Sequence, residues 1–215
     1  MSTPTPSHWE QVYREKGEPQ TSWFRPHLDE SLRWIDALAL PADAPAIDVG
    51  GGRSTLVDDL LARGFANVTV LDLSESALAQ SRARLGDRAG TVHWLAGDIT
   101  AIELPAGRYA LWHDRAVFHF LTDVTAQRRY VEIAAHAVRP GGHLVIATFA
   151  LDGPERCSGL PVSRYDAASL SARFAPYFEK LGDSRDVHRT PFDTDQSFTY
   201  VHLRRRADAD GAPAV

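Results

Sequence analysis

Three aspartates stand at the ends of apolar runs around a glycine-rich turn in the first half of this 215-residue chain. Asp48 precedes glycines 50–52, Asp72 ends the next apolar run, and Asp98 follows a third one. Glycines let a ligand lie against the main chain, and a helix that begins after such a turn offers free N–H groups. An acid at Asp48 discourages an anionic pyrophosphate and favours a ligand with a cationic part.

Asp72 and Asp98 extend this candidate site toward a nucleoside. Asp72 follows the turn at the spacing at which an acid can accept hydrogen bonds from both hydroxyls of a ribose. Asp98 can accept a hydrogen bond from an exocyclic amine. Together with Asp48, these acids predict a nucleoside that carries a positively charged amino-acid tail.

Two other kinds of glycine-rich site fit this turn less well. A dinucleotide-binding turn would need Gly or Ala where Thr55 stands, so that helix and strand could pack closely. A phosphate-binding P-loop would need a lysine followed by Ser or Thr. Asp48 and Thr55 therefore disfavour an oxidoreductase that uses a nicotinamide cofactor.

A second group of reactive side chains follows the fourth strand-like run. It contains His113, Asp114, Arg115 and His119. Asp114 with His119 could form a catalytic pair that deprotonates a nucleophile. In the alternative interpretation, Asp114 contacts the cofactor and His119 is half-buried beside phenylalanines.

These side chains must be positioned by strands and helices that alternate along the chain. The pattern predicts strands over 46–49, 67–73, 91–95, 109–112 and 143–149, and helices over 27–40, 54–63, 74–85, 125–138 and 166–174, with a short helix from Ser7. Such alternation is typical of a parallel sheet covered by helices on both faces. Two further strands, over 180–188 and 197–204, follow each other without a helix and predict an antiparallel hairpin at one edge.

Composition excludes several classes of partner. Lys and Arg number 23 against 28 Asp and Glu, and this net charge of −5 predicts no nucleic-acid partner. No apolar run approaches the roughly 20 residues of a membrane span, so we expect no membrane partner. One cysteine, Cys157, allows no internal disulfide and suits the cytoplasm. The sequence predicts no particular oligomeric state.

The motifs resemble those of the class I S-adenosylmethionine-dependent methyltransferases over about residues 45–150. The resemblance is carried by Asp48–Ser54 (D-x-G-x-G-x-S), Leu71-Asp72, Gly97-Asp98-Ile99 and Arg139-Pro140-Gly141-Gly142 before a strand. The N-terminal His8-Trp9 with Tyr13, followed by Ser22-Trp23-Phe24, is similar to a subset that includes small-molecule and protein-lysine methyltransferases.

The resemblance implies S-adenosyl-L-methionine as the methyl donor, with S-adenosyl-L-homocysteine as the product. Asp48 and the glycines would hold the methionine part, Asp72 the ribose, and Asp98 with Ile99 the adenine. Asp114 would face the methionine amino group or the substrate, and aromatic rings at Trp9 and Tyr13 suit a lid that attracts the sulfonium. The implied donor-binding set is Tyr13, Trp23, Asp48, Gly50, Gly51, Gly52, Ser54, Asp72, Leu73, Gly97, Asp98, Ile99 and Asp114, and no metal is implied.

The implied fold is α/β, a single three-layer Rossmann-like domain with a mostly parallel seven-stranded sheet and an antiparallel C-terminal hairpin. We expect an N-terminal helical lid segment over residues 1–44, an S-adenosylmethionine-binding methyltransferase domain over 45–206 and a disordered tail over 207–215.

We expect this domain to transfer a methyl group to a small-molecule nucleophile by in-line displacement. The chain adds no substrate domain and has few candidate bases, which favours a compact acceptor. A thiolate or selenide would need no base, whereas a hydroxyl or an ammonium would. The alternatives are a protein-lysine methyltransferase, or a noncatalytic protein that binds S-adenosylmethionine.

Overall fold

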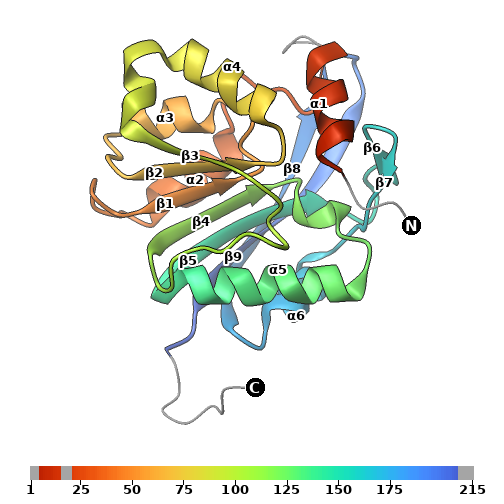
Figure 1. Cartoon of the computed structure of the whole chain (residues 1–215). Helices are drawn as coiled ribbons and strands as arrows, with labels where there is room; N and C mark the ends of the chain where they lie inside the picture. Colours follow the sequence, from red (N-terminus) through yellow and green to blue (C-terminus); the bar gives the residue numbers. More distant parts are fainter. Residues whose placement is uncertain (1–4, 16–20, 208–215) are drawn as a thin grey trace.

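The computed structural model describes residues 5–15 and 21–207, which contain a seven-stranded sheet. Its strands are β1 (Ala46–Val49), β2 (Val68–Asp72), β3 (Val92–Ala96), β4 (Tyr109–Arg115), β5 (Val138–Phe149), β8 (Phe178–Arg189) and β9 (Asp195–Arg205). The order across the sheet is β3-β2-β1-β4-β5-β9-β8 (Figure 1). The first five strands run parallel, and β9 pairs antiparallel with both β5 and β8. This arrangement confirms the predicted fold class, including its C-terminal hairpin.

The strand order reverses between β1 and β4, which are neighbours although β2 and β3 intervene in the sequence. In open sheets of this kind, ligands bind at such a reversal, outside the carboxyl ends of the strands. In the β1–β4 register, Asp48 lies beside His113 and Val49 beside Asp114. The topology therefore places the first acid and the second reactive group at the same edge of the sheet.

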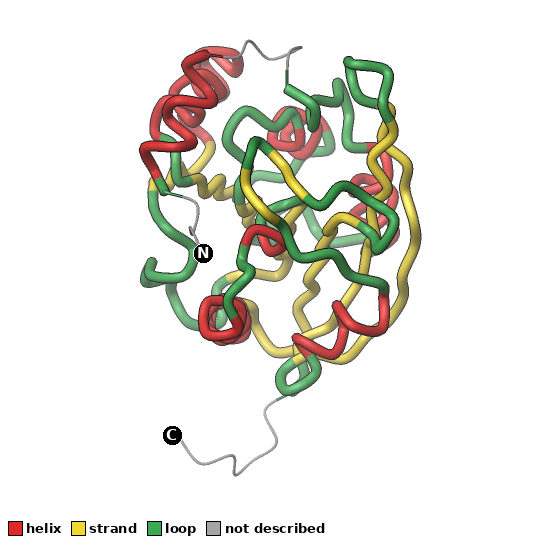
Figure 2. Tube along the Cα trace, turned by 90° about the vertical axis from the view of Figure 1, so that its right-hand side faces the viewer, coloured by secondary structure: helices red, strands yellow, loops and turns green. Residues whose placement is uncertain are grey.

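Helices cover both faces of the sheet (Figures 1 and 2). The apolar residues of α2 (Asp29–Ala37), α3 (Leu56–Ala62) and α4 (Glu75–Leu85) pack in one core cluster. Those of α5 (Val124–Ala137) and α6 (Ala167–Phe174) pack in the other. Helix α1 (Pro6–Glu15) contacts α4, and a carboxylate oxygen of Glu10 accepts a hydrogen bond from the Ser74 hydroxyl at 2.7 Å. The sheet and the helices on its two faces thus form the three layers that the alternating pattern predicted.

Side-chain caps explain where three of the helices begin. The Ser74 hydroxyl accepts a hydrogen bond from Ala77 N at 3.1 Å and caps α4. Asp123 accepts hydrogen bonds from the first N–H groups of α5, and Asp166 forms a capping box with Ser169 at α6. Such caps satisfy N–H groups that have no partner within the helix, each contributing about 1 kcal/mol.

Several elements differ from the sequence-based expectation. Strand β5 begins at Val138, five residues earlier than predicted, with a register shift where it meets β4. The segment between β5 and α6, for which no strand is predicted, contains a small second sheet, β6 (Arg156–Cys157) with β7 (Leu160–Pro161). Short 3-10 turns occupy η2 (Gly86–Thr91) and η3 (Phe118–Phe120). Of the expected tail at 207–215, all but the first residue lies outside the described residues.

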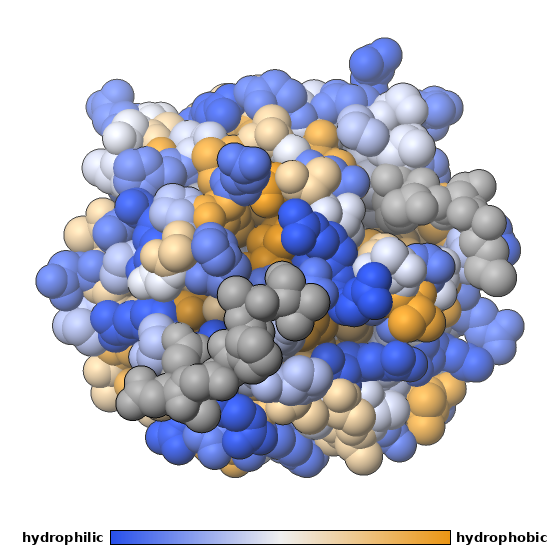
Figure 3. Space-filling model, turned by 60° about the horizontal axis from the view of Figure 1, so that its bottom comes forward, coloured by the Kyte–Doolittle hydropathy of each residue, from blue (hydrophilic) through white to orange (hydrophobic). Residues whose placement is uncertain are grey.

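One face of the molecule shows how polar and apolar side chains are distributed on it. The face turned to the viewer in Figure 3 is largely hydrophilic, with apolar side chains showing in scattered patches. Among the described residues, no helix has the length and apolar character needed to cross a membrane.

Candidate active site

The glycine turn between β1 and α3 leaves no room for a side chain at any of its three positions, since a Cβ on Gly50 would lie 2.0 Å from the Val117 side chain. A Cβ on Gly51 would lie 2.6 Å from Oδ2 of Asp48, and a Cβ on Gly52 would lie 2.6 Å from Oδ2 of Asp72. Both distances are shorter than real Cβ contacts, so only glycine lets the two carboxylates come this close to the main chain. The turn therefore brings the acids at the ends of β1 and β2 to one place.

Asp48 is one end of a buried chain of polar side chains. Its Oδ1 accepts a hydrogen bond from Nδ1 of His113 at 2.7 Å, and Nε2 of His113 lies 2.9 Å from the Ser31 hydroxyl. Ser31 in turn lies 3.3 Å from the hydroxyl of Tyr200. The other carboxylate oxygen of Asp48, Oδ2, is buried and has no hydrogen-bond partner in the part of the chain that the structure describes. Buried carboxylate oxygens usually have a hydrogen-bond partner. The unpaired Oδ2 of Asp48 can therefore accept a hydrogen bond from a donor group of a ligand.

Asp72 is buried at the end of β2, where its Oδ1 accepts a hydrogen bond from Ser74 N at 2.8 Å. Burial raises the pKa of Asp72 to about 7, and the nearby charge of Asp48 adds to the rise. A ligand that donates hydrogen bonds to this carboxylate would stabilise its charged form. Asp98, half-buried beyond β3, accepts two hydrogen bonds of 2.8 Å from Thr100 through Oδ1.

One cavity gathers most of the residues that the sequence singled out. Its walls include Tyr13, Trp23, Asp48, Gly50, Ser54, Asp72, Leu73, Gly97, Asp98 and Ile99. Gly51 and Gly52 shape the turn from behind, because their missing Cβ atoms make room for the carboxylates of Asp48 and Asp72. The structure thus brings the candidate donor-binding residues to one site, apart from Asp114.

Aromatic rings from the N-terminal segment form one wall of this cavity. Trp9 lies 5.9 Å from Tyr13, 6.0 Å from Trp23 and 5.2 Å from Phe120, measured between ring centroids. Trp9, Tyr13, Trp23 and Phe120 all line the cavity. Their packing attaches α1 and the segment after it to the core of the domain.

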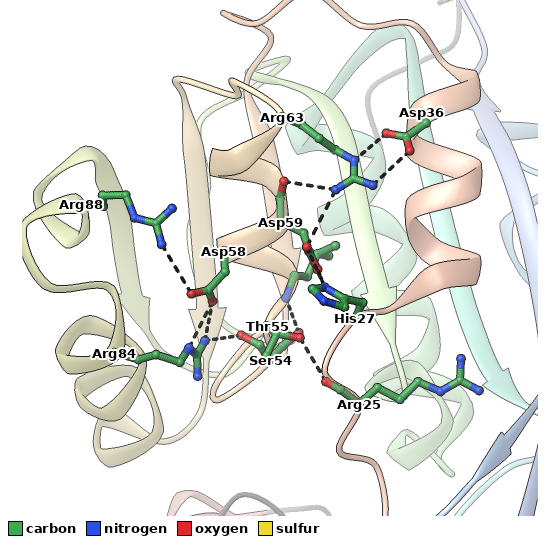
Figure 4. Close-up of polar contacts among 11 residues, drawn as sticks. Arg25, His27, Asp36, Ser54, Thr55, Asp58, Asp59, Arg63, Arg84 and Arg88 are labelled. Atoms are coloured by element: carbon green, nitrogen blue, oxygen red, sulfur yellow. Dashed lines mark hydrogen bonds and ion pairs between the residues drawn. The ribbon is translucent and has the colours of Figure 1, made fainter.

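Figure 4 shows how the start of α3 is anchored to its neighbours. Arg84 on α4 donates hydrogen bonds to the Ser54 carbonyl at 2.7 Å and to Oδ2 of Asp58 at 2.8 Å. The Thr55 hydroxyl donates to the Arg25 carbonyl at 3.1 Å. Thr55, the residue that fits a dinucleotide-binding turn poorly, therefore holds the N-terminal segment against the glycine turn.

The structure corrects the prediction for Asp114, which does not line the cavity. Its side chain is fully buried on the other face of the sheet and accepts hydrogen bonds from Val117 N (2.8 Å), Phe118 N (3.1 Å) and the Tyr130 hydroxyl (2.5 Å). Burial raises the pKa of Asp114 to about 6. These contacts support a structural role, in which Asp114 fixes the turn after β4.

His119 is likewise not a wall of the cavity. It is fully buried, with its ring 4.5 Å from Phe120 and 4.7 Å from Phe149. Its Nδ1 accepts a hydrogen bond from Phe149 N at 3.4 Å. Burial lowers the pKa of His119 to about 3, so the ring is neutral and a poor base at neutral pH. The described residues show no hydrogen bond between Asp114 and His119, so the predicted pair is not formed.

Several cavity residues did not enter the predicted set. Arg115, Cys157, Gln196 and Phe198 all line the cavity, from β4, the β6–β7 hairpin and β9. Arg115 belongs to the group of reactive side chains that the sequence places after the fourth strand, whereas Gln196 and Phe198 reach the site only when β9 folds back beside β5. Ser31 carried no sequence signal either, since its contact with His113 depends on how α2 packs on the sheet.

Comparison with known proteins identifies the domain. A family model for a methyltransferase domain matches residues 46–142. Over 89 residues, the chain is 32% identical to EEF1A lysine methyltransferase 2 of Mus musculus, a match that covers 38% of this chain and 36% of that protein. Over 119 residues, it is 29% identical to the ubiquinone/menaquinone biosynthesis C-methyltransferase UbiE of Roseobacter denitrificans, covering 54% and 46%. The chain thus spans about a third to a half of the length of these relatives.

Solved structures share the fold at low sequence identity. One, described as showing the conversion of a disulfide bond into a thioacetal group during echinomycin biosynthesis, superposes with a TM-score of 0.75 at 20% identity and covers 95% of this chain and 94% of that one. The N-methyltransferase NodS of Bradyrhizobium japonicum WM9, in complex with S-adenosyl-L-homocysteine, gives a TM-score of 0.69 at 16% identity, covering 92% and 98%.

The residues at the site fit the methyl donor of this family. S-adenosylmethionine carries an ammonium group and a ribose diol, which are hydrogen-bond donors. The unpartnered Oδ2 of Asp48 and the buried carboxylate of Asp72 are acceptors that such groups could satisfy. Because the family match, the fold and the acids agree, we identify residues 46–142 as a methyltransferase domain of the class I S-adenosylmethionine-dependent type.

Proposed function

We propose that this chain transfers a methyl group from S-adenosylmethionine to a small-molecule nucleophile that binds in the same cavity. In this assignment, Asp48 and the glycine turn hold the methionine part of the donor. Asp72 holds the ribose, and Asp98 with Ile99 holds the adenine. The bound donor supplies an electrophilic methyl group on a sulfonium.

The small number of acidic side chains in the cavity supports a small acceptor over a lysine side chain. Among the described residues that line the cavity, the acids are Asp48, Asp72 and Asp98, and each already has a role toward the donor. A lysine side chain enters a site as a cation, and an acceptor channel for lysine would gain from a further acid. The β4 and β9 side of the cavity instead presents Arg115, Gln196 and Phe198.

The chain's own contribution to the reaction is alignment and exclusion of water. The aromatic wall of Trp9, Tyr13 and Trp23 supports a role for the N-terminal segment as a lid over the sulfonium. His113 is the only histidine among the described residues that line the cavity, and both of its ring nitrogens already have polar partners. An acceptor that reaches the cavity already as a nucleophile, such as a thiolate, would need no base from the protein.

A second candidate is a protein-lysine methyltransferase. It is favoured by the similarity to EEF1A lysine methyltransferase 2 and by the aromatic rings that line the cavity. The two candidates differ in the size of the methylated product, which can be measured without knowing the acceptor.

The test is a transfer assay with S-adenosylmethionine that carries a radiolabelled methyl group. Cell extract is separated by ultrafiltration into a small-molecule fraction and a protein fraction, and each is incubated with the full chain. Label on a small product supports the proposal, and label on protein alone contradicts it in favour of the lysine methyltransferase. Donor binding with no label in either fraction identifies a noncatalytic binder. Asp72→Ala, which removes the ribose-binding acid, is the negative control.

A further inference from the structure

Arg115 is half-buried and has hydrogen-bond donors that are not satisfied. It lies at the end of β4 and lines the cavity. Its Nε and Nη2 atoms are buried and have no hydrogen-bond partner among residues 5–15 and 21–207, while Nη1 donates one long bond of 3.4 Å to the Trp23 carbonyl. Burying such groups without partners costs free energy, and an unpaired charge costs more. A ligand that satisfied them would recover this cost.

The guanidinium of Arg115 also has no acidic ion-pair partner among the described residues. Among the described residues, no carboxylate forms an ion pair with Arg115, whose charge lies over the Phe198 ring at 4.2 Å from its centroid. The neighbouring Arg25 shows the contrast, because it pairs with Asp186 at 3.0 Å and also donates to His188. The positive charge of Arg115 contributes to lowering the pKa of His119 and of His188. In the part of the chain that the structure describes, the positive charge of Arg115 on the acceptor side of the cavity therefore has no counter-ion.

The two unpaired nitrogens define the shape of the missing partner. The N–H of Nε and one N–H of Nη2 lie along the same edge of a guanidinium and point in the same direction. Two oxygens of one planar anion can accept both bonds at once, which is the bidentate geometry that arginine forms with carboxylates. Gln196, another cavity residue, has a buried Oε1 without a hydrogen-bond partner among the described residues, and this oxygen could accept a hydrogen bond from a donor group elsewhere on the same ligand.

We propose that Arg115 binds an anionic group, of the carboxylate type, on the methyl acceptor. This assignment rests on the proposed methyltransferase function and narrows its substrate to small acids. The carboxylate of the donor's methionine part has the same chemistry, so the experiment must distinguish the two sources. Arg115 is a specificity-determining residue in this assignment, because it selects the acceptor and leaves the donor's affinity unchanged.

The experiment measures binding in two steps with the full chain. First, S-adenosylhomocysteine is titrated into the wild type and into Arg115→Gln, Arg115→Lys and Arg25→Gln by calorimetry. Then pairs of carboxylic acids and their primary amides, such as benzoate with benzamide and 4-mercaptobenzoate with 4-mercaptobenzamide, are titrated into each protein saturated with S-adenosylhomocysteine. The members of a pair share shape and differ in charge.

We expect the wild type to bind the acid of at least one pair at least 10-fold more tightly than the amide. In Arg115→Gln, this preference should fall below 3-fold, while S-adenosylhomocysteine affinity stays within 3-fold of the wild type. Arg115→Lys should keep part of the preference, since lysine keeps the positive charge but loses the pair of parallel N–H donors. Arg25→Gln should keep it in full, because its charge is already paired.

Three results would separate the possible failures. If Arg115→Gln weakens S-adenosylhomocysteine 10-fold or more, the arginine binds the donor's carboxylate and the acceptor assignment is wrong. If the wild type binds acids and amides equally, or if Arg115→Gln keeps the preference, no anion site exists at Arg115. If the wild type does not bind S-adenosylhomocysteine, the proposed function itself fails. A circular dichroism spectrum and a thermal midpoint for each variant confirm that it is folded.

Discussion

The carboxylate of Asp48 accepts a hydrogen bond from Nδ1 of His113 at 2.7 Å, across the neighbouring strands β1 and β4. This bond occupies one oxygen of Asp48 and leaves the other without a partner at the glycine turn. His113 is held in turn by Ser31. In the proposed assignment, in which Asp48 holds the donor's cationic part, this relationship makes His113 a positioning residue, and its consequences can be measured.

Replacing His113 by leucine should weaken donor binding. Oδ1 of Asp48 would lose its partner in a buried position, and the carboxylate would be free to rotate away from the ligand. We expect S-adenosylhomocysteine affinity to fall about 10-fold, and the free energy of unfolding to fall by about 1–3 kcal/mol. Calorimetry and urea unfolding measure the two effects. Tyr200→Phe removes only the hydroxyl at the far end of the hydrogen-bonded series Asp48–His113–Ser31–Tyr200 and should keep the affinity for S-adenosylhomocysteine within about 3-fold. Unchanged affinity in His113→Leu would contradict the positioning role.

Gly52→Ala should abolish most donor binding without unfolding the protein. The new Cβ would lie 2.6 Å from Oδ2 of Asp72 and 3.0 Å from the Tyr13 hydroxyl, so one of these groups must move. We expect at least about a 10-fold loss of S-adenosylhomocysteine affinity, which corresponds to about 1.4 kcal/mol. Gly90→Ala is the matched control, since a Cβ at Gly90 would meet no atom within 4 Å. Equal affinity in the two variants would show that the turn does not approach the ligand.

Donor affinity should rise with pH around neutrality. Burial raises the pKa of Asp72 to about 7 in the ligand-free protein, and hydrogen bonds from the ribose favour the charged carboxylate. S-adenosylhomocysteine should therefore bind more tightly at pH 8 than at pH 6, by several-fold. In Asp72→Asn, which cannot titrate, this change should disappear. A pH dependence that survives in Asp72→Asn would assign it to another group.

The raised pKa of Asp72 also predicts how the stability of the folded protein changes with pH. The folded pKa of Asp72 lies above its unfolded value, so the folded state binds more protons between about pH 4 and 7. The stability that Asp72 contributes is thus present below pH 4 and is lost as the pH rises through 7. Asp114, with a pKa of about 6, acts in the same direction. Urea unfolding at pH 5 and pH 8 should therefore show that Asp72→Asn gains stability relative to the wild type at the higher pH.

Tyr130→Phe tests the structural role of Asp114. The hydroxyl of Tyr130 donates to Asp114 and accepts a hydrogen bond from Nε1 of Trp112 at 2.9 Å. Its removal leaves buried polar atoms unsatisfied and should cost about 1–3 kcal/mol of stability. S-adenosylhomocysteine affinity, measured well below the thermal midpoint, should stay within about 2-fold. A large loss of affinity with unchanged stability would instead place Asp114 at the ligand.

Local patterns in the sequence determined the fold class and much of the candidate site. Alternating strands and helices specify a covered parallel sheet, and parallel strands bring their carboxyl ends to one edge. Asp72 is the last residue of β2, Asp48 is the last but one of β1, and Asp98 closely follows β3, so their meeting follows from topology alone. The edge hairpin was also readable, because two strand-like runs follow each other without a helix.

Only the tertiary structure decided which side chains after β4 reach the cavity. Side chains alternate between the two faces of a strand, so His113 and Arg115 point one way and Asp114 the other. The sequence shows this alternation but not which layer covers each face. In the fold, α5 and its Tyr130 enclose Asp114, whereas His113 and Arg115 line the cavity. The packing of helices on the two faces therefore separated a structural acid from the residues available to ligands.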